Sequence, residues 1–455
     1  MAYQRISGSR GASGIISLGL MLAACVDLGA PSDGMPGARD SREDLQRRKG
    51  SHEVLAAPNV VTDWAGIVQA AINNPTAPRP PASSEVLHAM IVLAMYDAAM
   101  AIEGGYEPFA AHVQAPAGAD VRAAVATAAY LTARARVLAS QFAYLDAQYA
   151  AYLTSIANGQ AKDDGILVGK GAAAAMIALR ANDGFDNVVL YQCGAVPAPV
   201  GEFEPNGGCG TQPVDTKMAT VRPFTFVDPS RFRPDGPDPL TSRSYAEDFR
   251  EVRDYGRANS AVRTAEQTDI AYFWSENGYV HWNRNLIDLA VSRGLSIGET
   301  ARFFAMVHTS AADAVIAGFD AKYFFRAWRP RTAIPRASGD GNPDTEPDAT
   351  WVPLLTVNHP EYPSAHGFWS TAVTDAVASF FGTNAVTWTI TTSKAAVPQL
   401  VHEERTYHDV NALMREIDDA RVWAGLHWRH SMRHGDQVGR KVARHVTTSF
   451  FRPTS

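Results

Sequence analysis

The chain has 455 residues, 46% of them apolar and 19% charged, so it is long enough to bury a large core. Its 41 Lys and Arg against 47 Asp and Glu give a net charge of −6 with His neutral, which argues against a general nucleic-acid binder. Three cysteines exclude a disulfide-dense scaffold and a four-Cys metal cluster. After residue 30 we find no apolar stretch approaching the roughly 20 residues that span a bilayer. We therefore expect membrane contact only through the N-terminus.

Residues 1–25 have the pattern of a secretory signal. Two arginines precede an apolar run, residues 15–24, that ends at Cys25. The final Leu-Ala-Ala-Cys resembles a bacterial lipobox, which implies cleavage before Cys25, lipidation of its thiol, and a periplasmic or cell-surface location. An ordinary signal cut after a small residue is the alternative. Residues 26–57 are rich in Gly, Pro, Asp, Arg and Ser, and predict a flexible tether.

The other two cysteines, Cys193 and Cys209, lie in a segment rich in Gly and Pro. Because export implies an oxidising compartment, we expect them to form a disulfide. It would close a loop of 17 residues and add on the order of 3 kcal/mol of stability. Two free thiols are the alternative.

The N-terminal part of the body, residues 58–183, predicts a helical bundle. Residues 84–103 contain more apolar residues than a single buried stripe of a surface helix would need, which indicates a fully buried helix. Ser84 is its expected N-cap. A Gly- and Pro-rich stretch, 184–242, follows, and we expect it to pack as an ordered loop layer held by the disulfide. The helices expected in this bundle are 60–73, 84–103, 119–139, 141–157 and 161–181.

Helical spacing resumes in residues 243–455, which predict a second bundle. A loop rich in Pro, Asp and Gly interrupts it at 331–362, and 385–392 is a possible short strand. No dinucleotide fingerprint or Walker-type phosphate loop is found in the sequence. The expected fold is all-α, with two packed helical bundles and long ordered loops. The helices expected in this second bundle are 243–257, 264–275, 279–294, 297–327, 365–382, 402–429 and 432–449.

Three short segments of this second bundle carry residues suited to an anion. In the first, Lys322 and Arg329 are seven residues apart, which places both cations on one helical face roughly 10 Å apart. Pro330 is expected to end that helix. A solvated basic face is the alternative, although the aromatic neighbours Tyr323 and Trp328 argue for burial.

In the second segment, Ser364 is expected to cap a helix and His366 to lie in its first turn, where free N–H groups attract anions. Simple capping is the alternative. The third segment holds Arg421, a planar donor suited to oxyanions, and His427, about 9 Å further along the same expected helix. Elsewhere, His402, His408, His430 and His434 are expected to have surface or hydrogen-bonding roles.

The three segments together resemble the active-site signature of vanadium-dependent haloperoxidases, which reads Lys-x6-Arg-Pro, then Pro-Ser-x-His, then Arg-x5-His. The same signature occurs in the soluble acid phosphatases of the phosphatidic acid phosphatase type 2 superfamily. Together with the all-helical body and the segment around Val221, the resemblance covers most of 58–450 and favours the bacterial haloperoxidase-like branch. It implies a haloperoxidase/acid phosphatase-like fold with the oxyanion site in residues 243–455.

The resemblance implies a role for each matching residue. Three cations would neutralise the oxygens of vanadate or phosphate, and a hydroxyl and a backbone N–H would bind them. Lys322 and His366 would be catalytic, His366 as the acid–base. His427 would be the axial group, ligating vanadium in a haloperoxidase or attacking phosphorus in a phosphatase. The oxyanion-binding residues are Lys322, Arg329, Ser364, Ala365 and Arg421.

The sequence departs from the family pattern at two positions: Ala365 stands where Gly is usual, and Ala420 where Ser is usual. Neither change removes a charged or ligating group. His359, five residues before the motif Ser, occupies a position that carries His in algal bromoperoxidases, although a loop His capping a turn is the alternative. Phe319, three residues before the motif Lys, would form an aromatic wall of the halide and substrate pocket, where haloperoxidases commonly carry Trp.

The leading hypothesis is therefore a vanadate-dependent oxidoreductase that uses hydrogen peroxide to oxidise halide, bromide favoured, in the presence of a small organic acceptor. A soluble acid phosphatase with a phosphohistidine intermediate and no cofactor is the alternative. A third hypothesis is a lipid-anchored oxyanion-binding protein without turnover, for which Ala365 is the best support. The sequence leaves the oligomeric state open.

Overall fold

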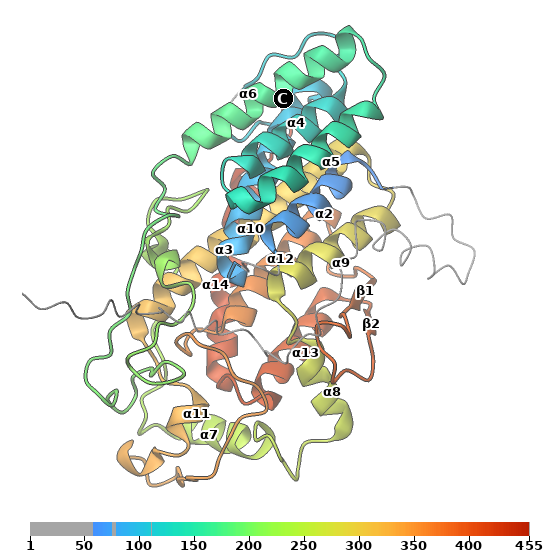
Figure 1. Ribbon diagram of the computed structural model, residues 1–455. Coiled ribbons are helices and arrows are strands. Elements are labelled where there is room, and N and C mark those ends of the chain that lie inside the picture. The colour runs from blue at the N-terminus through green and yellow to red at the C-terminus, as the bar shows by residue number, and fades with distance from the viewer. Residues whose placement is uncertain (1–57, 75–78, 111, 455) are drawn as a thin grey trace, which may run out of the picture.

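The computed structural model describes residues 58–74, 79–110 and 112–454. The signal, Cys25 and the whole tether lie outside these residues, so those expectations stay predictions. The described residues form thirteen α-helices, α2 to α14, and one small antiparallel sheet. The expected all-α class with two packed bundles is confirmed (Figure 1).

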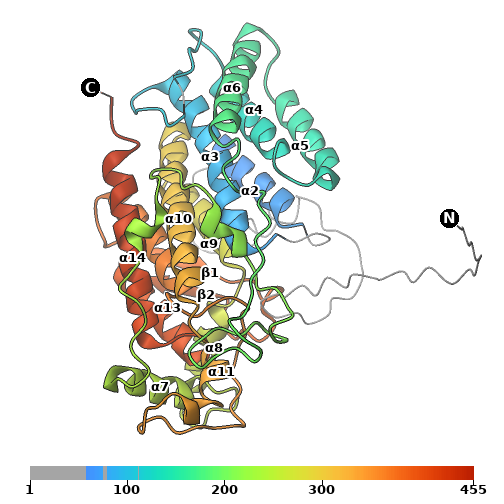
Figure 2. The ribbon, with the colours of Figure 1, turned by 90° about the vertical axis from the view of Figure 1, so that its left-hand side faces the viewer.

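Five helices form one end of the molecule (Figures 1 and 2). Side chains cap two of them, Asn59 at α2 and Asp120 at α4. The expected cap at Ser84 is wrong: α3 begins at Pro81, whose missing N–H suits a first turn, and Ser84 is buried inside the helix. The helices are α2 (Val60–Ile72), α3 (Pro81–Glu103), α4 (Val121–Arg134), α5 (Phe142–Thr154) and α6 (Gln160–Leu179).

Among the described helices, α3 alone has the length and apolar composition to cross a membrane, with a mean hydropathy of 1.6 over 18 residues. The expectation that no such stretch follows residue 30 is therefore wrong. However, 89% of that window is buried within the fold, against α4, α6 and α10 (Ile297–Phe325). Here α3 is a core helix.

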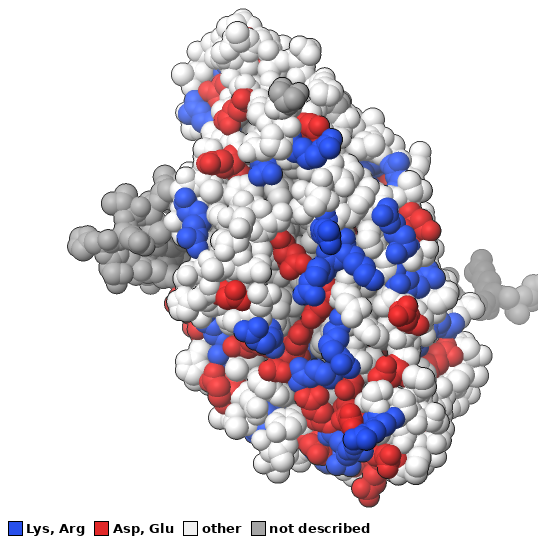
Figure 3. Space-filling model, turned by 180° about the vertical axis from the view of Figure 1, so that it is seen from behind, with Lys and Arg blue, Asp and Glu red and all other residues white. Residues whose placement is uncertain are grey.

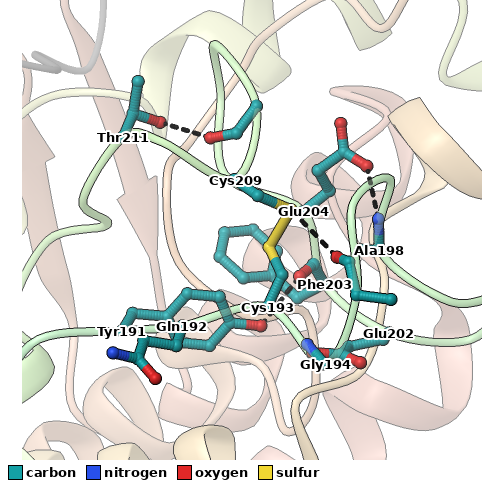
Figure 4. Close-up of a disulfide and its surroundings, with 12 residues drawn as sticks. Tyr191, Gln192, Cys193, Gly194, Ala198, Glu202, Phe203, Glu204, Cys209 and Thr211 are labelled. Carbon is teal, nitrogen blue, oxygen red and sulfur yellow. Dashed lines mark hydrogen bonds between the residues drawn. A yellow bond between two sulfur atoms is a disulfide. The ribbon is translucent and has the colours of Figure 1, made fainter.

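A long loop layer runs along one side of the molecule between α6 and α7 (Arg243–Tyr255), as Figure 1 shows. It contains the expected Cys193–Cys209 disulfide, with the two Cα atoms 5.7 Å apart (Figure 4). The layer is also bonded to the segment that follows α10, because the Phe203 N–H donates to the carbonyl of Arg326 at 2.7 Å. It therefore supports the part of the chain that carries the first motif.

Residues 402–429 of the second bundle differ from expectation. Residues 402–429 were predicted as a single helix, but Glu404–Tyr407 forms β2, which pairs antiparallel with β1 (Trp388–Thr391). The helix α13 starts only at Val410, where Asp409 caps it. The remaining helices are α8 (Ala265–Phe273), α9 (Gly278–Ser292), α11 (Pro330–Ala333), α12 (Ala365–Phe381), α13 (Val410–Trp423) and α14 (Arg429–Ser449).

Helix α10 runs through the centre and packs against α3 on one side and α12 and α14 on the other. The close contact between α12 and α14 depends on glycine. A Cβ at Gly439 would lie 2.3 Å from the Phe368 carbonyl oxygen, and one at Gly435 would lie 2.7 Å from that of Ser364. The start of α12, which carries the second motif, and the first three turns of α14, which follow the third motif, are thus held together by backbone contact.

Candidate active site

The first motif is divided between two helices. α10 ends at Phe325, because Arg326 adopts a left-handed backbone (φ 52°) and donates its N–H to the Lys322 carbonyl. Lys322 lies in the last turn of α10, whereas Arg329 is the N-cap of α11. The expectation of one helix continuing to Pro330, with both cations on one face, is therefore wrong.

The third motif is divided as well. α13 ends at Trp423, and Gly425 takes a left-handed conformation (φ 74°) that favours glycine at a helix end. Arg421 lies in the last turn of α13, while His427 lies in the connection to α14. The expected single helix carrying both residues is wrong, because the chain turns at Gly425.

The second motif forms as expected. Ser364 is the fully buried N-cap of α12, and its Oγ accepts a hydrogen bond from the Gly367 N–H at 3.3 Å. Ala365 and the half-buried His366 are the first two residues of the helix. Their backbone N–H groups belong to the first turn, which has no intrahelical acceptors and favours anions.

Arg329 contacts all the loops that carry the motifs. Its Nε donates to the His359 carbonyl at 2.7 Å, and its Nη2 donates to His359 Nδ1 at 3.0 Å. Its Nη1 donates to the Leu426 carbonyl at 2.8 Å and lies 3.4 Å from His427 Nε2. The guanidinium, 4% exposed, thus joins α11, the loop before α12 and the loop before α14.

Lys322 binds the same loop before α12. Its Nζ donates to the carbonyls of Pro360 and Glu361, at 2.9 and 3.0 Å. The side chain is fully buried. Burial lowers the pKa of Lys322 well below its usual range, the Arg329 charge acts in the same direction, and Glu361 opposes both.

Arg421 and His366 meet at the C-terminal end of α8. Arg421 Nη1 donates to the Trp274 carbonyl at 2.7 Å, and His366 also forms a hydrogen bond with the Trp274 backbone. Burial, and next the charge of Arg421, lower the pKa of His366 well below its usual range. The imidazole is therefore held neutral beside a permanent cation.

His427 is 1% exposed. Burial lowers the pKa of its imidazole well below the usual range, and the charges of Arg329, Lys322 and Arg421 add to the effect. A neutral imidazole keeps one nitrogen lone pair, which makes it a ligand or a nucleophile.

Sequence reasoning missed Glu361. Its Oε1 lies 2.7 Å from His427 Nδ1 and accepts the Trp428 N–H at 3.2 Å, and the side chain is fully buried. Burial raises the pKa of this carboxyl. The available signal was a lone acidic residue among 358–367, immediately before the Tyr-Pro-Ser that opens α12.

The two predicted pocket residues lie beside this group. The His359 and Phe319 rings are 5.4 Å apart between centroids, and Phe319 also meets Phe368 edge to face. Because His359 accepts from Arg329, its ring adjoins the cationic centre. Direct contacts therefore join Arg329, His359, Phe319 and His427, and Lys322 binds the loop that carries His359. The Trp274 backbone joins Arg421 to His366, and the charges of Lys322 and Arg421 both act on His427.

The other histidines of this region form hydrogen bonds, as expected. His430 Nδ1 pairs with Asp248 at 2.7 Å and His434 Nδ1 with the Tyr362 hydroxyl at 2.6 Å. His402, together with Glu266 and Asp269, could by distance hold a metal ion. However, Arg405 donates to both carboxylates, so a guanidinium already occupies one side of that cluster and offsets part of its charge. His408 Nδ1 lies 3.3 Å from the Thr387 hydroxyl.

Comparison with known proteins matches about a third of the chain to a family model. Residues 302–454 match the family model described as "VCPO second helical-bundle domain". No curated protein matches the chain. The sequence resemblance to the vanadium haloperoxidase and phosphatidic acid phosphatase type 2 superfamily is confirmed for this region, which holds all three motifs.

The whole fold is similar to three solved structures. The first bacterial vanadium-dependent iodoperoxidase has a TM-score of 0.74 and 19% identity, over 89% of this chain and 99% of that one. The holo-type bacterial vanadium-dependent chloroperoxidase gives 0.68 and 18%, over 88% and 98%. The apo-type chloroperoxidase gives 0.61 and 18%, over 89% and 98%. The two-bundle vanadium haloperoxidase fold is therefore shown.

Proposed function

We propose that the protein is a vanadium-dependent haloperoxidase that oxidises halide with hydrogen peroxide in the presence of a small organic acceptor. One observation carries the proposal: Arg329 Nη1 lies 3.4 Å from His427 Nε2 in a buried setting. A permanent cation thus lies against a neutral nitrogen ligand. A small oxyanion with a coordination site for nitrogen matches both groups.

The donor set fits vanadate. A tetrahedral oxyanion carrying two or three negative charges requires several fixed cations, and Lys322, Arg329 and Arg421 supply three. The Ser364 hydroxyl and the Ala365 N–H would bind further oxygens, and His427 Nε2 would ligate the vanadium. Bound vanadate would supply the activation of hydrogen peroxide toward attack by halide.

The remaining roles belong to the chain's own groups. The Pro360 and Glu361 carbonyls fix the Lys322 ammonium, so its third donor direction remains for an oxyanion or an incoming peroxide. The Trp274 carbonyl orients His366, whose lowered pKa keeps it neutral and able to accept a proton at its other ring nitrogen. Each group is positioned before substrate arrives, which reduces the cost of reorganisation.

Bromide is the proposed halide. His359 supports this choice, because its ring lies against Arg329 at the position that the sequence resemblance associates with bromoperoxidases. Chloride and iodide, assayed in parallel with bromide, give the relative rates that test this preference.

The test of the function compares two activities of the full chain after loading with vanadate. We expect peroxide-dependent bromination of a phenol, and a loss of at least about 100-fold in His427→Ala, the range seen when one group acting in a transition state is removed. His408→Ala is the control, because this exposed residue lies outside the site. Hydrolysis of an aryl phosphate is measured beside bromination.

Two results would contradict the proposal. Phosphate release without bromination at any pH would favour the phosphatase, which would use the same cage and His427 as nucleophile. Vanadate binding with neither activity would favour a binding protein. Ala365→Gly, which removes the methyl group at this position, would then be the first variant to assay.

A further inference from the structure

We propose that Glu361 is a positioning residue that holds His427 in the Nδ1–H tautomer. The Nε2 lone pair would then face the cations of the site. The consequence for vanadate rests on the proposed function, whereas the tautomer itself does not.

Two neighbours that can only donate determine the direction of these hydrogen bonds. The Trp428 N–H donates to Glu361 Oε1 at 3.2 Å, so this oxygen acts as an acceptor. The same oxygen lies 2.7 Å from His427 Nδ1, which is therefore the donor. On the other side of the ring, Arg329 Nη1 can only donate toward Nε2, which is therefore an acceptor.

No other described group competes closely for His427 Nδ1. The Ser431 hydroxyl is the alternative, but it is 3.5 Å away, at the limit for a hydrogen bond. Both His427 and Glu361 are at most 1% exposed, so bulk water has no access to the contact. Partners that orient a ligating histidine in this way fix both its tautomer and its ring orientation.

The backbone of Glu361 is fixed as well. Its N–H donates to the Ala327 carbonyl at 2.9 Å, and its carbonyl accepts from Lys322 Nζ at 3.0 Å. Three residues later the chain reaches Ser364, the cap of α12. One short loop therefore orients the axial histidine, anchors the buried lysine and begins the helix with the expected acid–base, His366.

Without the carboxylate, the ring could protonate at Nε2 or rotate, and either change removes the lone pair from the cage. Glu361→Ala deletes the acceptor. Glu361→Met also deletes it but fills the same volume, which keeps the test valid if the alanine variant unfolds. Glu361→Gln retains an acceptor oxygen. Glu85→Ala is the matched control, because Glu85 is an equally buried glutamate, 2.9 Å from His308 Nδ1 and outside the site.

The first readout is the ¹⁵N NMR spectrum of His427 in the full chain without vanadate, assigned by its loss in His427→Gln. We expect a protonated Nδ1 in the wild type and in Glu361→Gln, and a shift toward protonated Nε2 in Glu361→Ala and Glu361→Met. The second readout is vanadate affinity from a calorimetric titration. We expect it to fall about 10- to 100-fold in the alanine and methionine variants. Glu85→Ala should change neither readout.

A protonated Nε2 in the wild type would overturn the proposal, as would an unchanged tautomer in both acceptor-less variants. A changed tautomer with unchanged vanadate affinity would overturn the positioning role. A wild type that binds no vanadate would refute the proposed function instead, and the NMR result would still decide the assignment of the tautomer to Glu361.

Discussion

Arg329 shows why the residue type matters at the site. Its guanidinium donates to the backbone carbonyls of His359, Pro360 and Leu426 and reaches two imidazoles at the same time. A lysine has one flexible ammonium and could not make this planar set of contacts. The sequence motif predicted a cation at 329, but not that it would hold together the loops around it.

Asp418 and Asp436 form a carboxyl pair between α13 and α14, with Asp436 also accepting from the Thr371 hydroxyl at 3.1 Å. Burial raises the pKa of both groups, and for Asp436 the charge of Asp418 raises it further. Because the folded state holds protons that the unfolded chain releases near pH 4, the contribution of the pair to stability is complete below about pH 4. It is lost as the pH rises through the elevated folded-state pKa.

We predict that Asp436→Asn loses less stability than the wild type as the pH rises. The melting temperature of the wild type should fall between about pH 5 and pH 9, and that of the variant should fall less. The difference in unfolding free energy should be at least about 1.4 kcal/mol, the equivalent of one pKa unit. Asp163→Asn, an exposed position on α6, is the control and should follow the wild type. Parallel melting profiles for Asp436→Asn and the wild type would contradict the shared-proton interpretation.

Glu361 could not be predicted from the spacing of a sequence motif. The cations, the cap and both motif histidines follow a recognisable spacing, so the sequence could predict them. The carboxylate that contacts His427 comes from 66 positions earlier in the chain. No periodicity connects two such residues, and only the folded path of the loop before α12 brings them together.

At the scale of elements, hydrophobic spacing predicted most helices to within a few residues, but not the breaks that shape the site. Gly425 was a visible signal for the end of α13. Arg326 was not, because a left-handed conformation is uncommon for a residue other than glycine. The short strand β2 was also missed, since four residues are too few to show an alternating pattern.

The contact between α12 and α14 gives a prediction at this scale. In Gly439→Ala the new Cβ would overlap the Phe368 carbonyl, so the two helices must separate. We expect a loss of about 1 to 3 kcal/mol in unfolding free energy, the usual cost of overpacking. Vanadate affinity should also fall, because Ser364 and His366 begin α12.

Denaturant titration measures the stability, and Gly66→Ala in α2 is the control. A Cβ at Gly66 meets nothing within 4 Å, so the same change should stabilise the protein by about 0.5 to 1 kcal/mol. Equal effects of the two substitutions would refute the argument from close packing.

For the whole molecule, the two bundles share one hydrophobic core. Residues from α2 to α6, from α8 to α10 and from α12 to α14 belong to the same buried cluster, and α9 packs on α2 and α3. The central helix α10 therefore links the N-terminal bundle to the site through its last turn, where Lys322 lies.

The net charge of −6 says little about function. On the face shown in Figure 3, basic and acidic side chains lie side by side. The three cations of the proposed site, in contrast, are at most 4% exposed. The cations proposed to bind the oxyanion are thus buried, so neither the net charge nor the charges on the surface reveal them.

We propose that Lys322, Arg329 and Arg421 surround one oxyanion that His427 ligates. A crystal structure of the full chain with vanadate tests it most directly. We predict vanadium bonded to His427 Nε2, with its oxygens accepting from the three cations, Ser364 and the Ala365 N–H. Vanadate bound away from His427, or ligated through a different residue, would contradict this account.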